Sequence, residues 1–371
     1  MNIRKVTKLN DKTIINLVPS YSEAPVSLEI FRRDTEQILK SLSGRNPENT
    51  YLIINKNESE KLGLKKNHTG LMENINLIET QNAGGFAFSN KSALIKVLAD
   101  EKPFPSVKGI AESLEEASGS SERTVFISGK AVNKGMHTFD RMTTGRKILE
   151  AAGTVDSFKG IYLGYPVGHF ISEENLDEEI ELRTDYVEIY DDGSCMLEGL
   201  LEISKRFMRE CCGRCVFGYE GVSQINMILN DISLKKGKPY DMGLLTDLCS
   251  HMKGQSLCES GECMADSVMS CLDSYEDEIR EHASRKNCRS LACGRFVTYH
   301  ILADKCTGCT DCIDACEDDS INGKKRFVHV IDQDECTQCG KCVAACDEGA
   351  IIRAGSVKPK CPSKPVPCKA K

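Results

Sequence analysis

Apolar residues recur at intervals of three and four positions between residues 196 and 286, which is the spacing of helices with one apolar face. One such set consists of Ile225, Ile228, Leu229 and Ile232. The pattern predicts four helices, over residues 196–210, 220–235, 241–252 and 265–285. Amphipathic helices that follow one another in this way predict a small bundle.

A different pattern occupies residues 122–192, where short runs of β-branched and aromatic residues are separated by glycines. The runs predict three strands, over residues 124–128, 161–163 and 186–190. Residues 145–152 have helical spacing and stop at Gly153, a residue type that commonly ends helices. This order of strand, helix and strand predicts a compact α+β module of ubiquitin-like type.

The two ends of the chain carry weaker patterns. Residues 1–118 are expected to form an α/β segment with a helix over 27–42, a strand over 51–55 and a helix over 90–99. Residues 357–371 are rich in lysine and proline and are expected to be a flexible tail. Cys361 and Cys368 lie in this tail, where we expect free thiols or, alternatively, a metal site that a partner completes.

Composition narrows the class of protein. The chain is long enough for about two to four domains and has no apolar run of about eighteen residues, the length needed to span a membrane. Its start carries Lys5, Lys8 and Asp11 instead of the apolar stretch of a secretory signal, so we expect a cytoplasmic protein. The formal charge of −7 provides no basic footprint for nucleic acid and favours docking partners with basic patches.

Eight of the 20 cysteines form two runs of the pattern C-x2-C-x2-C-x3-C. In such a run three cysteines bind one 4Fe-4S cluster, and the fourth ligates the cluster of the other run. We therefore predict one cluster held by Cys306, Cys309, Cys312 and Cys346, and another held by Cys336, Cys339, Cys342 and Cys316. Thiolates that hold iron must stay reduced, so we expect a reducing, anaerobic compartment. A disulfide framework is the alternative interpretation of these cysteines, and the doubled spacing argues against it.

Residues 297–356 resemble bacterial two-cluster ferredoxins. In those proteins a proline usually follows the last cysteine of each run, whereas this chain has Glu317 and Asp347. Proline at this position stiffens a turn and is not a ligand, so cluster binding should survive the change. The acidic neighbours should lower both reduction potentials.

A second resemblance rests on the cysteines of the predicted bundle. Residues 210–215 read ECCGRC, and residues 257–261 read LCESG. These motifs are similar to the cluster-binding region of the NADH-binding flavoprotein subunit of complex I, a family shared with NAD-linked and electron-bifurcating hydrogenases and formate dehydrogenases. Residues 125–135 are similar to the ubiquitin-like module of that family, and Cys195 lies where the family carries a TCM motif. A two-cluster extension is a feature of the hydrogenase-type members.

The resemblance implies a further iron-sulfur cluster in the bundle, with one ligand changed. Three family ligands are present as Cys212, Cys215 and Cys258. The remaining family cysteine is Gly218 here, so Cys263 or Cys211 must replace it. We favour Cys263, because Cys211 is adjacent to a ligand. The alternative is a degraded site whose thiols only pack in the bundle.

The flavin domain of the same family opens with a glycine-rich loop, GRGGAGF, that holds the phosphates of FMN and of the nicotinamide cofactor. Nothing similar occurs in residues 1–118, and no other phosphate-binding glycine pattern replaces it. Residues 88–95 resemble only the end of that domain, with Asn90 and Lys91 in place of two acidic residues. We therefore expect a truncated remnant that binds neither FMN nor NAD.

Further metal ligands lie between the bundle and the ferredoxin segment, at His282, Cys288 and Cys293. One imidazole and two thiolates are three of the four ligands of a tetrahedral zinc site. Cys195, Cys271 or a further ligand from the ferredoxin segment could supply the fourth, and hydrogenase-type relatives carry similar residues at this junction. The alternative is a surface histidine with two unrelated thiols.

These predictions divide a multidomain α+β protein into five segments. The segments are a degenerate α/β remnant of a flavin-binding domain (1–118), a ubiquitin-like β-grasp module (119–194), a four-helix iron-sulfur bundle (195–287), a two-cluster ferredoxin-like domain (288–356) and the flexible tail (357–371).

The predicted clusters and the family resemblance together predict an electron-transfer subunit without a catalytic site of its own. It would belong to a multisubunit, electron-bifurcating, anaerobic oxidoreductase. It would pass single electrons between a flavin site on a partner and another redox subunit or ferredoxin. The resemblance implies as partners a flavoprotein subunit, a thioredoxin-like 2Fe-2S subunit and a catalytic oxidoreductase subunit, with no nucleic acid or membrane. Two alternatives stay open: an NAD(H)-oxidising flavoprotein with a divergent FMN site, and a non-redox scaffold.

Overall fold

The computed structural model describes residues 12–44, 48–81, 84–111, 113–153 and 157–368. The residues that argued against a secretory signal, Lys5, Lys8 and Asp11, lie outside these ranges. The chain divides into two compact units. The first unit comprises Met1–Asp192, Glu202–Met227 and Gly243–Ser274, and the second comprises Gly193–Leu201, Ile228–Met242 and Tyr275–Lys371. None of the helices in the described ranges combines the length and the apolar character needed to cross a membrane.

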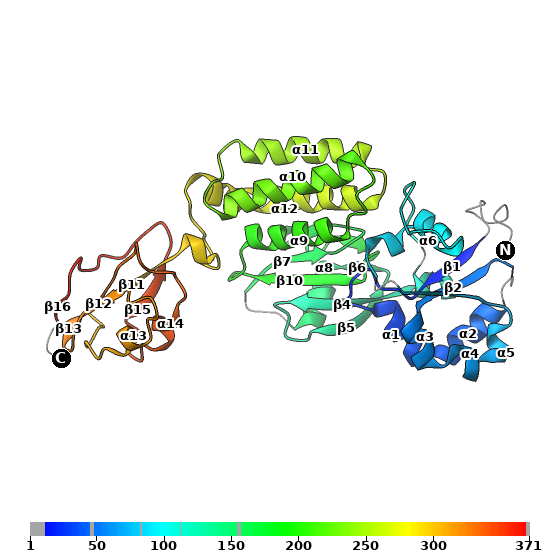
Figure 1. Ribbon diagram of the computed structural model, residues 1–371, viewed down its shortest axis with the longest axis horizontal. Coiled ribbons are helices and arrows are strands. Elements are labelled where there is room, and N and C mark those ends of the chain that lie inside the picture. The colour runs from blue at the N-terminus through cyan, green and yellow to red at the C-terminus, as the bar shows by residue number, and fades with distance from the viewer. Residues whose placement is uncertain (1–11, 45–47, 82–83, 112, 154–156, 369–371) are drawn as a thin grey trace. The chain divides into compact units, whose positions relative to one another are not determined.

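A parallel three-stranded sheet, in the order β1-β2-β3, opens the first unit. Its strands are β1 (Thr13–Asn16), β2 (Thr50–Asn55) and β3 (Asn76–Thr80). Helices cover both faces, since α6 (Lys91–Leu98) lies on the opposite side of the sheet from α2 (Thr35–Ser43) and α3 (Lys56–Leu62) (Figure 1). Shorter helical segments here are α1 (Val26–Arg33), α4 (Leu64–Asn67), α5 (Thr69–Met72), η3 (Phe86–Ser89) and α7 (Leu114–Ser118).

Two helices, α1 and α2, replace the single helix predicted over residues 27–42. Asp34 separates them with φ −125° and ψ 32°, outside the helical region. Aspartate and the β-branched Thr35 that follows it are both weak helix formers, which favours a break at this point. The predicted strand over 51–55 lies within β2, and the helix predicted over 90–99 corresponds to α6.

The second sheet of the first unit has five strands in the order β5-β4-β10-β7-β8. They are β4 (Glu122–Gly129), β5 (Gly135–Asp140), β7 (Phe158–Leu163), β8 (His169–Ser172) and β10 (Tyr186–Asp191). The strand β10 runs parallel to β4 and antiparallel to β7. The helix α8 (Gly145–Ala152) packs Ile148 and Ala152 into the apolar core of this sheet. Smaller elements are β6 (Met142–Thr144), its partner β9 (Glu179–Glu181) and η4 (Glu173–Asn175).

The predicted helices correspond to α9 (Met196–Glu210), α10 (Val216–Ser233), α11 (Asp241–Gln255) and α12 (Glu259–Ser284). Each of them has residues in both units. Within the first unit, α12 is hydrogen-bonded to the five-stranded sheet. The Tyr162 and Ser267 hydroxyls lie 2.9 Å apart, and the Phe170 N–H donates to the Ser270 hydroxyl at 3.0 Å. Tyr275, where the second unit resumes, interrupts the helical geometry of α12.

The second unit ends in two similar halves, each with a cysteine loop followed by a single helical turn. These turns are α13 (Asp311–Asp314) and α14 (Lys341–Ala344). The strands pair as β11 (Thr298–Ile301) with β15 (Ile351–Ala354), β12 (Ile321–Asn322) with β14 (Val330–Ile331), and β13 (Phe327–Val328) with β16 (Val366–Pro367). A short η5 (Gly294–Phe296) precedes them. The strand β16 lies within residues 357–371, the segment expected to be a flexible tail. The sequence pattern does not predict its pairing with β13.

Candidate iron-sulfur and metal sites

The first cysteine run and the end of the second run meet at one small cavity in the second unit. Its cysteines are Cys306, Cys309, Cys312 and Cys346. Gly308 and Thr310 have positive φ angles of 70° and 86°, which turn the loop so that its cysteines face the same space. Burial, followed by repulsion from the other three thiols, raises the pKa of Cys312 to about 12. The structure therefore brings together the four residues predicted for the first cluster.

A second cavity gathers the other predicted set. Its cysteines are Cys316, Cys336, Cys339 and Cys342. Burial is the first cause that raises the pKa of Cys342 to about 11, and the three other thiols add to it. The Gln338 N–H lies 3.4 Å from the Cys336 sulfur, and the Ala350 N–H lies 3.4 Å from the Cys346 sulfur of the first cavity. Thiol sets that receive backbone N–H donors suit the sulfur-rich, electron-dense surface of a 4Fe-4S cluster.

His329 lines the first cavity, and sequence reasoning did not identify it. Its side chain is 1% exposed, and its Nδ1 lies 3.1 Å from the sulfur of Cys312. Its Nε2 has no hydrogen-bond partner within the described part of the chain. Burial lowers the pKa of His329, which favours the neutral ring. No spacing rule connects this histidine to the cysteine runs, so only the fold reveals its position.

The bundle cysteines of the first unit surround a third cavity. Its cysteines are Cys211, Cys212, Cys215 and Cys258. The first three occupy the connection between α9 and α10, and Cys258 directly precedes α12. Phe86 and Tyr165 lie against the same cavity, with their rings stacked at a centroid distance of 4.3 Å. Burial raises the pKa of Cys258 to about 12.

Our preference for Cys263 as the fourth thiol of this site is not supported by the geometry. Cys263 lies inside α12, is 1% exposed and does not line the cavity. A Cβ added at Gly168 would lie 2.6 Å from the Cys263 sulfur, so this thiol packs beneath the Gly168 turn. The helix fixes its direction, whereas Cys211 follows the end of α9 and is turned toward the other thiols.

Gly218, which stands where the family carries a cysteine, also lines the third cavity. A Cβ at this position would come 2.6 Å from the sulfur of Cys215. A side chain at residue 218 would therefore require Cys215 to move.

The residues predicted to bind zinc form a compact group in the second unit. The group consists of Cys195, His282, Cys288 and Cys293, all buried, with their ligand atoms within 4.8 Å of one another. The Nε2 of His282 lies 3.4 Å from the Cys195 sulfur and 3.6 Å from the Cys293 sulfur. The Nδ1 of His282 lies 2.8 Å from the Glu278 carbonyl oxygen, a contact that orients the ring as in many metal sites. Cys195 is therefore the fourth member of this group.

The thiols of this group interact closely with one another and with the imidazole. The neighbouring thiols Cys195 and Cys293 lower the pKa of Cys288, so one thiolate forms readily. Burial opposes a charge on His282, but its contacts with the thiols dominate and raise its pKa to about 10, so the ring must release a proton when it binds a metal. Three thiols and one imidazole at this spacing suit tetrahedral zinc.

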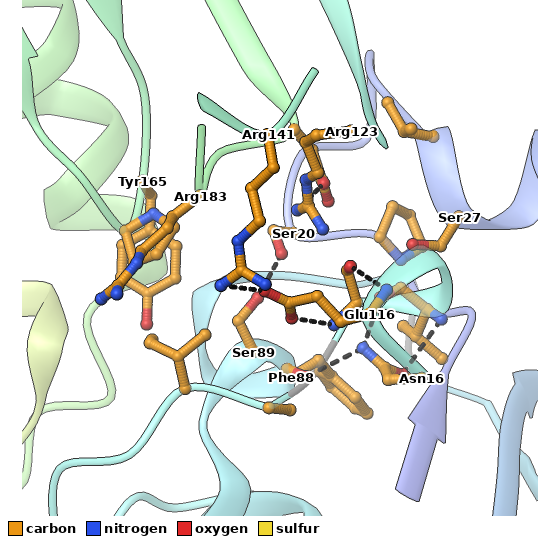
Figure 2. A pocket seen from close by; sticks show the side chains of 18 residues that line it. Asn16, Ser20, Ser27, Phe88, Ser89, Glu116, Arg123, Arg141, Tyr165 and Arg183 are labelled. Atoms are coloured by element: carbon orange, nitrogen blue, oxygen red, sulfur yellow. Dashed lines mark hydrogen bonds and ion pairs between the residues drawn. The ribbon is translucent and has the colours of Figure 1, made fainter. Parts of the chain in front are cut away.

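A further cavity of about 210 Å³ lies in the first unit, beyond the end of β1. Figure 2 shows Arg141 reaching across it toward Glu116, with which it forms an ion pair of 2.9 Å. Arg123 pairs with Asp185 at 2.5 Å, and Arg183 pairs with Glu181 at 2.6 Å. These guanidinium groups are thus engaged with carboxylates from the protein.

The fold and these sites define a multidomain iron-sulfur protein. Residues 198–282 match the family model described as the NADH-ubiquinone oxidoreductase-F iron-sulfur binding region, and residues 305–350 match a 4Fe-4S dicluster domain. The chain therefore carries the iron-sulfur region of that oxidoreductase family joined to a dicluster domain, and the resemblance stated from the sequence is confirmed.

Individual relatives agree with this assignment. The NADP-reducing hydrogenase subunit HndC of Solidesulfovibrio fructosivorans is 26% identical over 227 residues, which are 57% of this chain and 46% of the relative. The NADH-quinone oxidoreductase F protein of Streptomyces coelicolor is 23% identical over 175 residues, 44% of this chain and 39% of the relative. The chain thus spans about half or less of these relatives. An NAD+-reducing [NiFe]-hydrogenase in the H2-reduced state has a similar fold, with a TM-score of 0.63 and 14% identity over 76% of this chain and 58% of that chain.

Proposed function

We propose that this chain is an iron-sulfur electron-transfer subunit of an oxidoreductase complex, passing single electrons between a flavin site on a partner and another redox subunit or ferredoxin. The observation that carries the proposal is the pair of cavities in which thiols from both cysteine runs converge. A 4Fe-4S group held by such a thiol set supplies one-electron redox chemistry. The matched family regions and the relatives support the same function.

The residues around each thiol set have separate tasks. The cysteine thiolates hold the metal, and apolar side chains such as Ile301 and Ile351 at the first cavity keep water away. The Gln338 and Ala350 N–H groups and the His329 ring are placed to donate hydrogen bonds to cysteine sulfurs. Such donors stabilise negative charge on the sulfur and tune the reduction potential.

The third cavity is proposed to hold a further iron-sulfur cluster through Cys211, Cys212, Cys215 and Cys258. The donor set fits, because four thiols share one small space from which Phe86 and Tyr165 exclude solvent. Structural zinc is proposed for the group around His282, where the close spacing of four buried ligand atoms supports it.

The remaining assignments follow from the family resemblance. We propose that the five-stranded sheet is a β-grasp module and that the three-stranded sheet is a remnant of a flavin-binding domain. A flavoprotein, a thioredoxin-like 2Fe-2S subunit and a catalytic subunit are the proposed partners, in an anaerobic cytoplasm and with electron bifurcation as the overall reaction.

The cavity of about 210 Å³ favours one alternative, an NAD(H)-oxidising subunit with a divergent flavin site. Parallel sheets commonly bind cofactors beyond the carboxyl ends of their strands, which is where Asn16 and Val18 line this cavity. Its arginines are engaged with carboxylates, however, and the sequence has no glycine-rich phosphate loop. We therefore prefer the electron-transfer function to this one and to a non-redox scaffold.

The decisive test uses the complex that co-purifies with this chain under anaerobic conditions. Cys309→Ser and Cys339→Ser should each abolish electron transfer through the complex, with the partner subunits still bound. Transfer at the natural rate in both variants would contradict the proposal, and loss of the partners without loss of their own activity would support the scaffold.

A further inference from the structure

The C-terminal segment brings a fifth thiol to the first cysteine set. The strand β16 pairs antiparallel with β13, with Pro367 opposite Phe327. Cys368 directly follows β16, and its N–H donates to the carbonyl oxygen of Arg326 at 2.9 Å. The Arg326 N–H in turn donates to the carbonyl oxygen of Gly308 at 3.0 Å. Two backbone hydrogen bonds therefore connect Cys368 to the loop that carries Cys306 and Cys309.

The close approach depends on Gly308. A Cβ at this position would lie 2.7 Å from the backbone nitrogens of both Arg326 and Phe327, so only glycine allows β13 to pass this near the loop. The side chain of Cys368 packs against the same apolar core as Cys306, and its thiol interacts with those of Cys306 and Cys309. Cys368 thus lies beside the cavity, next to two of the predicted ligands.

The second cysteine set provides a natural comparison. Four cysteines line that cavity within the described residues, and they all belong to the two runs. The other cysteine of the C-terminal segment, Cys361, interacts with Asp304. Among the described residues, the two otherwise similar sets therefore differ, because the first has an additional thiol beside it, from the residue that follows β16.

We propose that Cys368 is a reserve ligand for the iron that Cys306 holds, an inference that rests on the proposed ligand sets. When the Cys306 thiolate is lost, the Cys368 thiol releases its proton to solvent and its sulfur takes the vacant position. Exchange in the natural chain is redox-neutral, since the iron–sulfur bond to Cys306 breaks, the bond to Cys368 forms, and the proton moves from Cys368 to Cys306.

The test compares equivalent variants of the two runs in the full-length protein, reconstituted anaerobically. Cys336→Ala should lose about one iron atom and show the electron paramagnetic resonance signal of an oxidised three-iron cluster. Cys306→Ala should keep its iron and show no such signal. Cys306→Ala/Cys368→Ala should behave like Cys336→Ala, while Cys368→Ala alone should keep the iron content of the natural protein.

Alkylation provides a second readout that does not depend on the spectra. With iodoacetamide and mass spectrometry, Cys368 should be labelled in the cluster-loaded natural protein and protected in Cys306→Ala. A three-iron signal in Cys306→Ala together with labelled Cys368 would overturn the inference. If Cys306→Ala fails to assemble two clusters while Cys336→Ala assembles its clusters, Cys368 does not replace Cys306, and the inference is overturned. Natural protein without two four-iron clusters would instead contradict the proposed function itself.

Discussion

Cys211 and Cys263 have the same side chain but different surroundings. Cys211 lines the third cavity, whereas Cys263 is enclosed within α12 under Gly168. We expect Cys211→Ser to remove the spectroscopic signal of the bundle cluster, because it deletes one of four converging thiols. Electron paramagnetic resonance of the reduced full-length protein measures this.

Cys263→Ser is the matched control and should keep the bundle signal, because its sulfur packs against Gly168 and Cys263 does not line the cavity. The reverse result, with the signal lost in Cys263→Ser and kept in Cys211→Ser, would identify Cys263 as the fourth ligand, as the sequence predicts. Cys258→Ser should remove the signal in either case.

His329 differs from the cysteines because we expect it to tune the proposed cluster and not to hold it. Its Nδ1 lies 3.1 Å from the Cys312 sulfur, and an N–H donor there stabilises the more negative, reduced state. A hydrogen bond worth about 1 kcal/mol corresponds to about 40 mV for one electron. We therefore expect His329→Leu to lower the potential of one of the two ferredoxin-type clusters by about that amount in a redox titration.

A suitable control is His300→Leu, since His300 lies on β11 and contacts the Thr298 hydroxyl. This variant should leave both potentials within a few millivolts of their natural values. Equal shifts in the two variants would mean that the effect comes from general disturbance of the domain.

The spacing of cysteines within a run predicts local ligands well, because a few residues of loop can only close around one metal group. This is why the two sets that include Cys306 and Cys336 meet as expected. The identity of the fourth bundle thiol depends instead on how α12 packs. The spacing of cysteines along the sequence does not show where this packing places Cys263. The positions of His329 and Cys368 likewise follow from strand pairing between distant segments.

Among the elements, the helices of the bundle were predicted most closely, because long amphipathic periods are strong signals. The helix predicted from residue 265 begins earlier in the structure, at Glu259 of α12. The small and polar residues of its first turns carry no apolar stripe that would predict this start. The strands β5 and β8 were not predicted. In β5 exposed and half-buried positions alternate, so this edge strand lacks the apolar run that identified its neighbours.

The four residues proposed to bind zinc come from separate elements, since Cys195 precedes α9 and His282 lies in the last turn of α12. We expect the natural protein to contain about one zinc atom per chain when purified without chelator, because structural zinc binds tightly at neutral pH. His282→Ala should reduce this below about a tenth of an equivalent and lower the midpoint of thermal unfolding. Inductively coupled plasma mass spectrometry and calorimetry measure the two effects.

His251→Ala serves as the control, because His251 lies on the exposed surface of α11. It should leave both the zinc content and the unfolding midpoint unchanged. Natural protein without zinc would contradict the assignment directly, whichever metal the cysteine runs contain.

For the whole molecule, three thiol-lined cavities predict about twelve iron atoms per chain, about four for each cluster. The isolated chain, with added FMN, should not oxidise NADH, because hydride chemistry needs a bound flavin to divide the electron pair. It should still accept electrons from a low-potential one-electron donor. Iron analysis and a spectrophotometric NADH assay with an artificial acceptor check both statements.

NADH oxidation by the isolated chain at a rate comparable to the complex would contradict the electron-transfer function. The cavity crossed by Arg141 would then be the flavin site, and Arg141→Ala should abolish the activity. Restored activity only when the partner flavoprotein is added would support the proposal.

The proposed zinc site also affects what happens when the chain is cut. Cys195 and His282 are 87 positions apart, and the bundle lies between them. A protease that cuts the connection between α10 and α11 would therefore leave two fragments that the proposed zinc would still join. Such a nicked protein should hold together less firmly after a chelator removes the metal, because the packing of α12 on the sheet then joins its fragments without it.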